Sequence, residues 1–238
     1  LPSFEFMSET LVVIPARGGS KGIPYKNIKV LGDKPLIQYS IDLAREIASD
    51  DMICVSSDDE KIIQVCEAVN LKVPFVRPEE LSTDNAGSYD VLLHALNYYL
   101  DKGIEVGKIV LLQPTSPFRN SKQLKEALSL WKEDSELIIS VKKTKANPYY
   151  LLMEENAEGY LELSKKEGDI TQRQNVPTVY EINGAIYIIS AQKLLQEKSL
   201  RAFKTQKYVM DEVSSIDIDE PLDWLYAETV IKNGLFEK

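Results

Sequence analysis

Short apolar runs alternate along the chain with longer stretches whose apolar residues recur every three or four positions. The run Leu11–Ile14 has the length and branched side chains of a buried strand, whereas Pro35–Ala48 has apolar residues at helical spacing. The alternation predicts strands at Leu11–Ile14, Met52–Val55, Val73–Val76, Lys108–Leu112, Leu137–Val141, Ala185–Ile189, Lys207–Met210 and Ser215–Asp219. It predicts helices at Pro35–Ala48, Asp59–Val69, Ser88–Leu100, Ser121–Trp131, Ala191–Glu197 and Pro221–Asn233. This order implies βαβ units, and therefore an α/β fold with a mostly parallel sheet flanked by helices.

The alternation stops between Ala146 and Glu181, where aromatic and charged residues follow no sustained period. Within this segment, Glu158-Gly159 is typical of a hairpin turn. A segment this thin cannot bury its own tyrosines, so we expect an arm that packs on a second subunit. A surface loop is the alternative, although long loops without structure are uncommon in compact domains. The sequence thus predicts an α/β domain of residues 7–145 and 182–238, a dimerisation arm at 146–181, and a homodimer.

The composition excludes several classes of protein. Of the 238 residues, 44% are hydrophobic and 27% charged, which suits a packed core, and no apolar stretch is long enough to span a bilayer. The net charge of −9 argues against a broad nucleic-acid surface but allows a local basic pocket for a small anion. Cys54 and Cys66 fit no metal spacing, so we expect buried, reduced thiols in a cytoplasmic protein. Residues 1–6 contain no secretory signal, and Met7 is a candidate natural start.

The first predicted strand ends in a glycine-rich basic loop. Its glycines, Gly18, Gly19 and Gly22, are spaced neither as in a P-loop nor as in a dinucleotide-binding motif. Glycines nevertheless let backbone N–H groups approach an anion closely. Arg17 and Lys21 add positive charge on either side of the turn. We therefore expect a bound anion here, with a solvent-exposed basic turn as the alternative.

Two carboxylates near the C-terminal end form a second candidate. Asp217 and Asp219 are two residues apart on a predicted strand, so both point to one face, while Ile216 and Ile218 point to the other. Neighbouring carboxylates repel each other unless a cation or solvent lies between them. Mg²⁺ prefers a few carboxylate oxygens together with substrate phosphates. The pair is therefore a candidate metal site, and a polar strand edge is the alternative.

A stiff polar segment follows the strand predicted at Lys108–Leu112. It contains Gln113, Thr115 and Ser116, with two prolines between and after them. Polar loops of this kind at strand ends suit substrate positioning. The alternative is a turn leading into the next helix, capped by Ser121.

Two further features have ordinary explanations. Asn183-Gly184 leads directly into a predicted strand and can be read as a tight turn. His94, the sole histidine, lies within a helical apolar pattern, and we expect it to pack rather than to catalyse.

Five segments in this order resemble the CMP-N-acetylneuraminate (sialic acid) synthetase family, which includes the enzymes that activate legionaminate. The matching residues are Ile14-Pro15-Ala16-Arg17 with Ser20-Lys21-Gly22 and Lys26-Asn27, Arg77-Pro78 with Glu80-Leu81, Leu112–Pro117 with Arg119, Asn183–Tyr187, and Ser215–Asp219. They extend over nearly the whole chain. The resemblance implies a Rossmann-like nucleotide-binding domain with a small dimerisation domain.

The resemblance also implies roles for individual residues. It implies CTP-binding residues at Ala16, Arg17, Lys21, Asn27, Arg77 and Ser88, with Arg77 and Ser88 on the cytosine side. It implies sugar-binding residues at Gln113, Thr115, Ser116 and Arg173, the last reaching across the dimer. Asp217 and Asp219 would hold Mg²⁺ or Mn²⁺, and Arg17, Lys21 and Asp217 would be the catalytic residues.

The implied reaction is attack of a sugar acid's anomeric hydroxyl on the α-phosphorus of CTP, with release of pyrophosphate. The chain departs from several sialic acid enzymes at Tyr180-Glu181-Ile182, where those carry a basic residue. Legionaminate or another nine-carbon (nonulosonic) acid is therefore open as the substrate. One alternative is the related enzyme for 3-deoxy-manno-octulosonate, whose opening loop usually differs. Another is a non-catalytic nucleotide-binding protein, which would not need Asp217 and Asp219. No nucleic-acid or membrane partner is expected.

Overall fold

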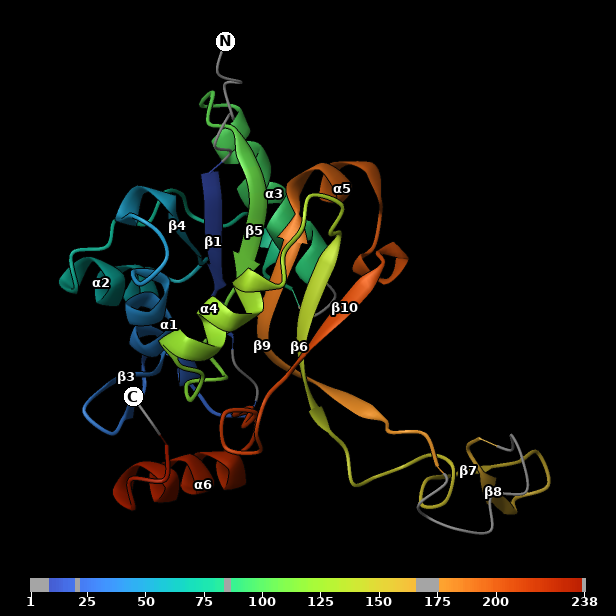
Figure 1. Cartoon of the computed structure of the whole chain (residues 1–238). Coiled ribbons are helices and arrows are strands. Elements are labelled where there is room, and N and C mark those ends of the chain that lie inside the picture. Colours follow the sequence, from blue (N-terminus) through green and yellow to red (C-terminus); the bar gives the residue numbers. More distant parts are fainter. Residues whose placement is uncertain (1–8, 20–21, 84–86, 166–175, 237–238) are drawn as a thin grey trace.

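Across residues 9–19, 22–83, 87–165 and 176–236, which the computed structural model describes, the longest strands form one six-stranded sheet (Figure 1). Its strands, in spatial order, are β10 (Thr205–Val209), β6 (Leu137–Lys143), β9 (Tyr180–Ser190), β5 (Val106–Leu111), β1 (Glu9–Pro15) and β4 (Ile53–Ser56). β9 runs antiparallel to both of its neighbours, whereas the other pairs are parallel. The prediction of a mostly parallel α/β sheet is confirmed.

Helices cover both faces of this sheet. They are α1 (Leu36–Ala44), α2 (Glu60–Ala68), α3 (Ser88–Leu100), α4 (Ser121–Ser129) and α5 (Ala191–Gln196), whereas α6 (Pro221–Lys232) lies beyond one end of the sheet (Figure 1). The alternation along β1 explains the two layers, because Val12 and Ile14 pack with α1, α2 and α4, whereas Leu11 and Val13 pack with α3 and α5. Among the described residues, no helix has both the length and the apolar character needed to cross a bilayer.

A further core cluster lies beneath α6 and joins segments that are far apart in the sequence. Ile23 comes from the glycine-rich loop, Phe118 from the segment after β5, and Ile216 and Ile218 from the segment before α6. Trp224 of α6 packs against them. The three segments singled out from the sequence therefore share one apolar base, which fixes them relative to one another.

Two predicted strands are absent from the described part of the chain. Val73–Val76 is an irregular segment in which Val76 alone bridges to Ser57, and Pro74 removes an N–H that a strand would need. Ser215–Asp219 is extended but joins no ladder, because it crosses the end of β5, where the Ile218 N–H donates to the Thr115 carbonyl oxygen at 2.8 Å. Ile216 and Ile218 are nevertheless buried, and Asp217 and Asp219 point to the other side.

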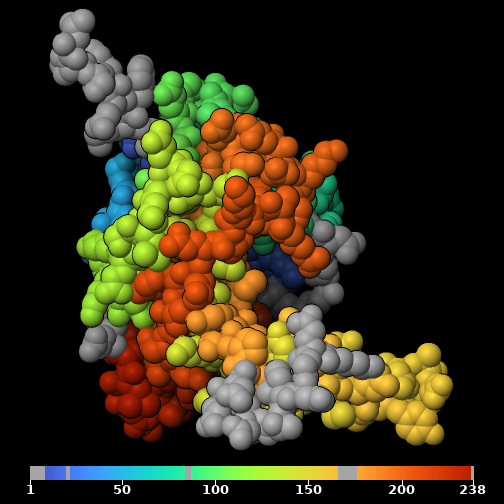
Figure 2. Space-filling view, turned by 45° about the vertical axis from the view of Figure 1, so that its right-hand side comes forward, coloured from blue at the N-terminus to red at the C-terminus, as the bar shows by residue number. Residues whose placement is uncertain are grey.

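The segment between β6 and β9 forms a hairpin that stands away from the body (Figures 1 and 2). β7 (Met153–Glu155) and β8 (Leu161–Leu163) pair antiparallel, and Gly159 adopts a φ of 85° in the turn, as the Glu158-Gly159 pair predicts. Several large apolar side chains of this hairpin and its approach are exposed: Leu151, Leu152, Met153, Tyr160, Leu161 and Leu163.

The remaining short elements connect these parts. Two-residue strands, β2 (Val30–Leu31) and β3 (Lys34–Pro35), form a small hairpin before α1. Single 3-10 turns lie at Lys26–Ile28, Asp50–Met52, Glu79–Leu81 and Leu200–Ala202.

Candidate active site

Two adjoining cavities open where β1 and β5 end. The smaller has a volume of about 320 Å³ and the larger about 630 Å³. Pro15, Arg17 and Gln113 line both, so the two form one continuous depression. Ligands of open α/β sheets bind at the carboxyl ends of the strands. The cavities therefore lie where the topology places a site.

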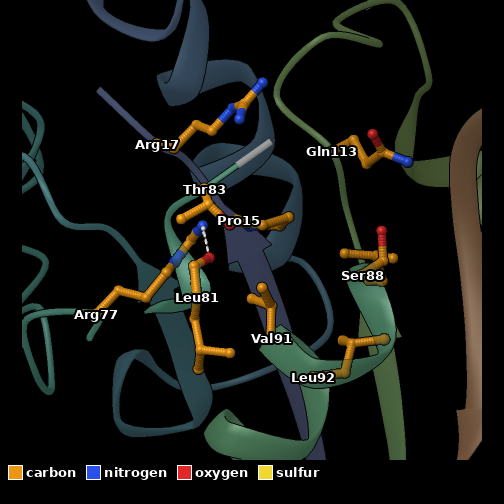
Figure 3. A pocket seen from close by; sticks show the side chains of 10 residues that line it. Pro15, Arg17, Arg77, Leu81, Thr83, Ser88, Val91, Leu92 and Gln113 are labelled. Carbon is orange, nitrogen blue, oxygen red and sulfur yellow. Dashed lines mark hydrogen bonds between the residues drawn. The ribbon is translucent and has the colours of Figure 1, made fainter. Parts of the chain in front are cut away.

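The smaller cavity has a mixed lining of polar and apolar residues. In Figure 3, Arg17 and Gln113 lie on opposite sides of it, and Ser88 projects from the first turn of α3. The apolar part of the lining consists of Leu81, Val91, Leu92 and Leu111. A flat heterocycle with polar edges suits such a lining. Of the residues expected to contact cytosine, both Arg77 and Ser88 line this cavity.

Arg77 is built into the wall of the smaller cavity. Its Nε donates to the Ser56 hydroxyl at 2.9 Å, and its Nη2 donates to the Ser56 carbonyl at the end of β4. Nη1 donates to the Leu81 carbonyl at 3.5 Å, the contact drawn in Figure 3. Burial lowers the pKa of Arg77 below its usual value, and the negative charge of Asp58 opposes that shift. Arg77 thus ties β4 to the cavity wall while supplying positive charge.

The larger cavity brings three sequence segments together. The glycine-rich loop contributes Arg17 and Lys26, and the last segment contributes Asp217 and Asp219. The remaining lining residues are Gly22, Asn27, Pro114, Thr115 and Glu220 together with the shared Pro15 and Gln113. Positive and negative side chains therefore face one cavity, as a site for a polyanion with a bound cation requires.

Two glycines of the opening loop are explained by packing within the chain. A Cβ on Gly22 would lie 2.2 Å from the Asp219 carbonyl oxygen, and one on Gly18 would lie 2.3 Å from Asp59 Oδ2. A Cβ on Gly19 would meet nothing within 4 Å. The glycines therefore let the loop approach α2 and the carboxylate segment closely, a reason that the sequence alone did not reveal.

Lys26 is the functional residue that sequence reasoning undervalued. Its side chain is buried, and its Nζ donates to the Ile218 carbonyl at 2.5 Å and to Asp219 Oδ1 at 2.9 Å. A buried ammonium group needs such partners. The available signal was its place in the Lys26-Asn27 motif. Its partners lie 192 and 193 positions away, so their contact could not be read from spacing.

Asn27 lies beside Lys26 and is also buried. Its Nδ2 donates to the Arg17 carbonyl oxygen at 3.1 Å, which closes the loop on itself. Both residues line the larger cavity, and of the two only Asn27 was predicted to contact CTP.

The Asp217 carboxylate has a raised pKa. The protein around it raises the pKa by desolvation, and the charge of Asp219 raises it further. A hydrogen bond from the Thr115 side chain and the charge of Lys26 act in the opposite direction. A cation bound beside Asp217 would favour its charged form and so oppose the shift.

The donor set fits a divalent cation whose coordination a substrate completes. Among the described residues, no group of three or more His, Cys, Asp or Glu side chains could hold a metal ion. Asp217, Asp219 and Glu220 are the acidic residues that line the larger cavity. Mg²⁺ is commonly bound by one or two carboxylates plus phosphate oxygens, whereas a self-sufficient protein site needs more ligands.

Two predicted contact residues lie behind the cavity rather than in it. Ala16 is fully buried in the core, and its N–H donates to the Ser56 carbonyl at 2.9 Å. Ser116 is also fully buried, and its carbonyl accepts from Arg119 Nη1. Neither side chain lines a cavity, so a contact of Ala16 with CTP or of Ser116 with the sugar stays a prediction that only backbone atoms of these residues could fulfil.

Arg119 supports the polar segment from behind. Its Nη1 also donates to the Gln113 carbonyl at 2.8 Å, and its Nη2 donates to the Ser40 hydroxyl of α1 at 2.6 Å. Burial lowers its pKa to about 9, and the charge of Asp217 opposes that shift. Gln113 and Thr115, the other two sugar contacts expected from this segment, do line the larger cavity.

Two predicted site residues, Lys21 and Arg173, lie outside the described residues. His94 packs against Phe75, with ring centroids 4.6 Å apart, and lines neither cavity. This placement agrees with the expected packing role.

Comparison with known proteins identifies the family to which the chain belongs. The family model described as "Cytidylyltransferase" matches residues 11–234. The chain is 32% identical to the CMP-N,N'-diacetyllegionaminic acid synthase of Legionella pneumophila, over 93% of this chain and 96% of that protein. It is 35% identical to the N-acylneuraminate cytidylyltransferase of Escherichia coli, over 94% of this chain but 52% of that protein.

A solved structure of CMP:2-keto-3-deoxy-manno-octonic acid synthetase complexed with CTP superimposes with a TM-score of 0.69. It covers 95% of this chain and 100% of that chain at 18% identity, which shows a shared fold. The family model spans nearly the whole chain, and the synthase of L. pneumophila aligns from end to end. The expected family is therefore confirmed: the chain belongs to the cytidylyltransferase family.

Proposed function

We propose that this enzyme transfers CMP from CTP to the anomeric hydroxyl of a nine-carbon 2-keto sugar acid and releases pyrophosphate. The observation that carries the proposal is the larger cavity, in which Arg17 and Lys26 face Asp217 and Asp219 beside a smaller cavity of heterocycle size. The end-to-end similarity to the L. pneumophila synthase supports a nonulosonic acid of the legionaminate or neuraminate class.

CTP would lie across both cavities. The cytosine enters the smaller one, where Arg77 and Ser88 offer polar contacts beside apolar walls. The triphosphate then extends into the larger cavity toward Arg17 and Lys26, and we assign Lys21 to the same task. Cytidylyl transfer, like phosphoryl transfer, depends mainly on alignment and on stabilising developing charge, so fixed cations are the expected machinery.

We further propose that Asp217 and Asp219 hold Mg²⁺, or Mn²⁺, together with the phosphates. The ion would offset charge on the attacked phosphate and on the departing pyrophosphate. The chain's own contribution is to keep both carboxylates at the cavity wall. The Ile218 N–H donates to the Thr115 carbonyl at 2.8 Å, and Lys26 donates to the Ile218 carbonyl at 2.5 Å.

The sugar acid would lie next to Gln113 and Thr115, at the junction with the phosphates. Gln113 lines both cavities, so its amide can meet groups on either side of the reacting bond. Glu181, at the position where several sialic acid enzymes are basic, forms an ion pair with Lys142 of β6 at 3.3 Å. This difference from those enzymes leaves legionaminate or another nonulosonic acid open as the substrate.

We also propose a homodimer in which the arm covers a second copy of the chain. Exposed apolar side chains gather on the hairpin, and Tyr160 and Leu161 are 68% and 64% exposed. Clusters of this kind mark interaction sites. Arg173 belongs to the same arm, and we assign it to the partner's sugar site.

A cytoplasmic location completes the proposal. Cys54 and Cys66 are both free and buried. Unpaired buried thiols are typical of proteins kept in a reducing compartment.

The proposal is tested by pyrophosphate release. The purified protein is mixed with CTP and Mg²⁺, and with N,N'-diacetyllegionaminate, N-acetylneuraminate or 3-deoxy-manno-octulosonate in turn. We expect release with a nine-carbon acid and none without sugar. Release with the octulosonate alone would favour the related eight-carbon enzyme, and CTP binding with no release for any acid would favour a nucleotide-binding protein. Either result would contradict the proposal.

A further inference from the structure

β9 contains a wide irregularity next to the larger cavity. It pairs with β6 at Tyr187 and again at Ile182, but the register shifts between these points, and its pairing with β5 ends at Tyr187. Residues 183–186 therefore leave the ladder at the end of the strand that leads to Gln113. Irregularities of this kind re-aim side chains and often lie next to active sites. This one begins with the Asn183-Gly184 pair, for which a simple turn is the ordinary explanation.

Side chains satisfy the backbone groups that the ladder leaves behind. The Ile186 N–H donates to the Ser140 hydroxyl oxygen at 2.7 Å, and the Ala185 N–H donates to Asn183 Oδ1 at 3.2 Å. The Ser140 hydroxyl in turn donates to Asn183 Oδ1 at 2.6 Å. The irregularity is thus held by a defined set of bonds rather than left loose.

Asn183 uses its whole hydrogen-bonding capacity in this set. Its Oδ1 accepts the two bonds just described, and its Nδ2 donates to Ser215 Oγ at 2.8 Å and to Met210 Sδ at 3.5 Å. An asparagine side chain has two donors and room for two acceptor contacts, and all four are occupied. Asn183, Ser140 and Ser215 are 4%, 1% and 3% exposed. A buried network with every group satisfied specifies one arrangement, because any shift leaves a polar group unpaired.

Ser215 lies two residues before Asp217, in the segment that carries both carboxylates. The Ile218 N–H fixes the same segment farther on, by its bond to Thr115 at 2.8 Å. We infer that Asn183 is a positioning residue: it touches no part of the cavities but holds Ser215, and thereby sets where Asp217 and Asp219 stand. This inference rests on the catalytic role proposed above for the two carboxylates.

Gly184 explains why the pair is Asn-Gly. Its φ is 71°, and a Cβ there would lie 3.5 Å from Gln113 Nε2 and 3.9 Å from Asp217 Oδ2. The backbone next to Asn183 thus turns back against two cavity residues in a conformation that favours glycine. Asn183 therefore anchors the carboxylate segment, and Gly184 supplies the left-handed backbone conformation that the chain needs directly after it.

The test compares Asn183→Ala, Ser215→Ala and the double variant. Ile189→Val, a fully buried truncation on the same strand that packs on the opposite face from the cavity segment, is the matched control for stability loss. The first measurement is hydrogen–deuterium exchange of the ligand-free protein, which needs no activity. We expect exchange of residues 213–220 to rise by about tenfold in both single variants and to stay unchanged in the control.

The second measurement is turnover with the sugar acid that the wild type accepts. We expect kcat to fall by about tenfold or more in each single variant, KM for CTP to change by less than about twofold, and the double variant to equal the worse single one. The control should keep kcat at a similar loss of Tm. If Asn183→Ala does not fold, Ser215→Ala carries the test.

Unchanged exchange at 213–220 would overturn the inference, and so would a kcat loss no larger than that of Ile189→Val. If the wild type transfers CMP to no sugar acid, the proposed function fails, yet the exchange measurement still decides whether Asn183 holds this segment.

Discussion

The side chains of the cavity walls and those of the arm differ in whether they find partners within the chain. In the walls, the buried polar groups of Arg77, Lys26 and Asn27 find hydrogen-bond partners within the same chain. On the arm, large apolar side chains such as Tyr160 and Leu161 face outward. A single chain therefore completes the framework of the cavities but does not cover the arm.

The difference indicates what each region lacks. Asp217 and Asp219 line the larger cavity together, and a cation with phosphates would offset the charge of both. The exposed apolar side chains of the arm have no packing partner within the described part of the chain, and a second copy of the chain would supply one. The predictions below change one region at a time, so that each measures how far it depends on the other.

The largest effect is expected for Asp219→Asn. The amide keeps the shape of the side chain but weakens a metal ligand, so we predict a folded protein that binds CTP with modest loss and turns over about 100-fold more slowly. Raised Mg²⁺ should restore part of the rate. Asp50→Asn, which removes an exposed partner of Arg45, is the control and should keep nearly full activity. Wild-type turnover in Asp219→Asn would remove the metal site from the mechanism.

The second largest effect is expected for Lys26→Met. It removes a cation from the cavity wall and leaves Asp219 without its ion-pair partner, so we expect turnover to fall by about 30-fold, with KM for CTP raised. Lys29→Met is the matched control, because Lys29 lies over the Trp224 ring at 4.1 Å and lines neither cavity. Steady-state kinetics of both variants at fixed Mg²⁺ decides the question, and equal losses would count against a role for Lys26.

Gly22→Ala tests whether packing of the loop on the carboxylate segment matters. The added Cβ would lie 2.2 Å from a backbone oxygen of Asp219, so loop or segment must move. We expect a loss of about 1–3 kcal/mol in the free energy of unfolding, typical of overpacking, and about tenfold slower turnover. Gly19→Ala, where the Cβ meets nothing within 4 Å, should leave the free energy of unfolding nearly unchanged. Urea titration of both variants gives the comparison.

The sequence predicted the sheet and its helices well because buried strands and amphipathic helices have local patterns. It failed at Val73–Val76 and Ser215–Asp219, which are apolar or alternating but join no strand ladder. At Ser215–Asp219 the alternation reported burial of one side, which an extended segment also shows, whereas Val73–Val76 is a short apolar run without alternating burial.

The site was predictable in its segments and less so in its contacts. The glycine-rich loop, the segment after β5 and the carboxylate pair do converge on one cavity. The contacts of Lys26 and Arg119 could not be predicted, because their partners are set by tertiary packing. The burial of the Ala16 and Ser116 side chains could not be predicted either, because a motif does not say which side chains face inward.

A smaller effect on activity is expected from the arm. The double substitution Tyr160→Ser and Leu161→Ser removes two exposed apolar groups from the hairpin, so the proposed dimer should dissociate while each chain stays folded. Light scattering at micromolar concentration measures the assembly. Val30→Ser, at an exposed position on the body, is the control and should leave it unchanged. A wild-type protein that is already monomeric would contradict the proposed assembly.

The smallest effect concerns the thiols of the body. Burial raises the pKa of Cys54 and of Cys66 from the usual value near 9 to about 12, so both should resist alkylation at pH 8 in the native protein and react once it is unfolded. Because the pKa of each thiol is higher in the folded than in the unfolded protein, the contribution of the thiols to the free energy of unfolding is fully present below the unfolded-state pKa. That contribution should be lost as pH rises from about 9 toward 12, which urea titration can follow.

The same thiols sharpen the comparison between body and arm. Neither thiol lies in the arm, and both are in the core that carries the sheet. If the arm is an appendage that only a partner covers, the Tyr160→Ser/Leu161→Ser variant should label as slowly as the wild type, counted by mass spectrometry after timed alkylation at pH 8. Ile189→Val, which loosens the body itself, should label faster, since global opening exposes the thiols. Rapid labelling of the arm variant would mean that the body depends on the arm for its stability, because opening of the core would then follow from loss of the interface.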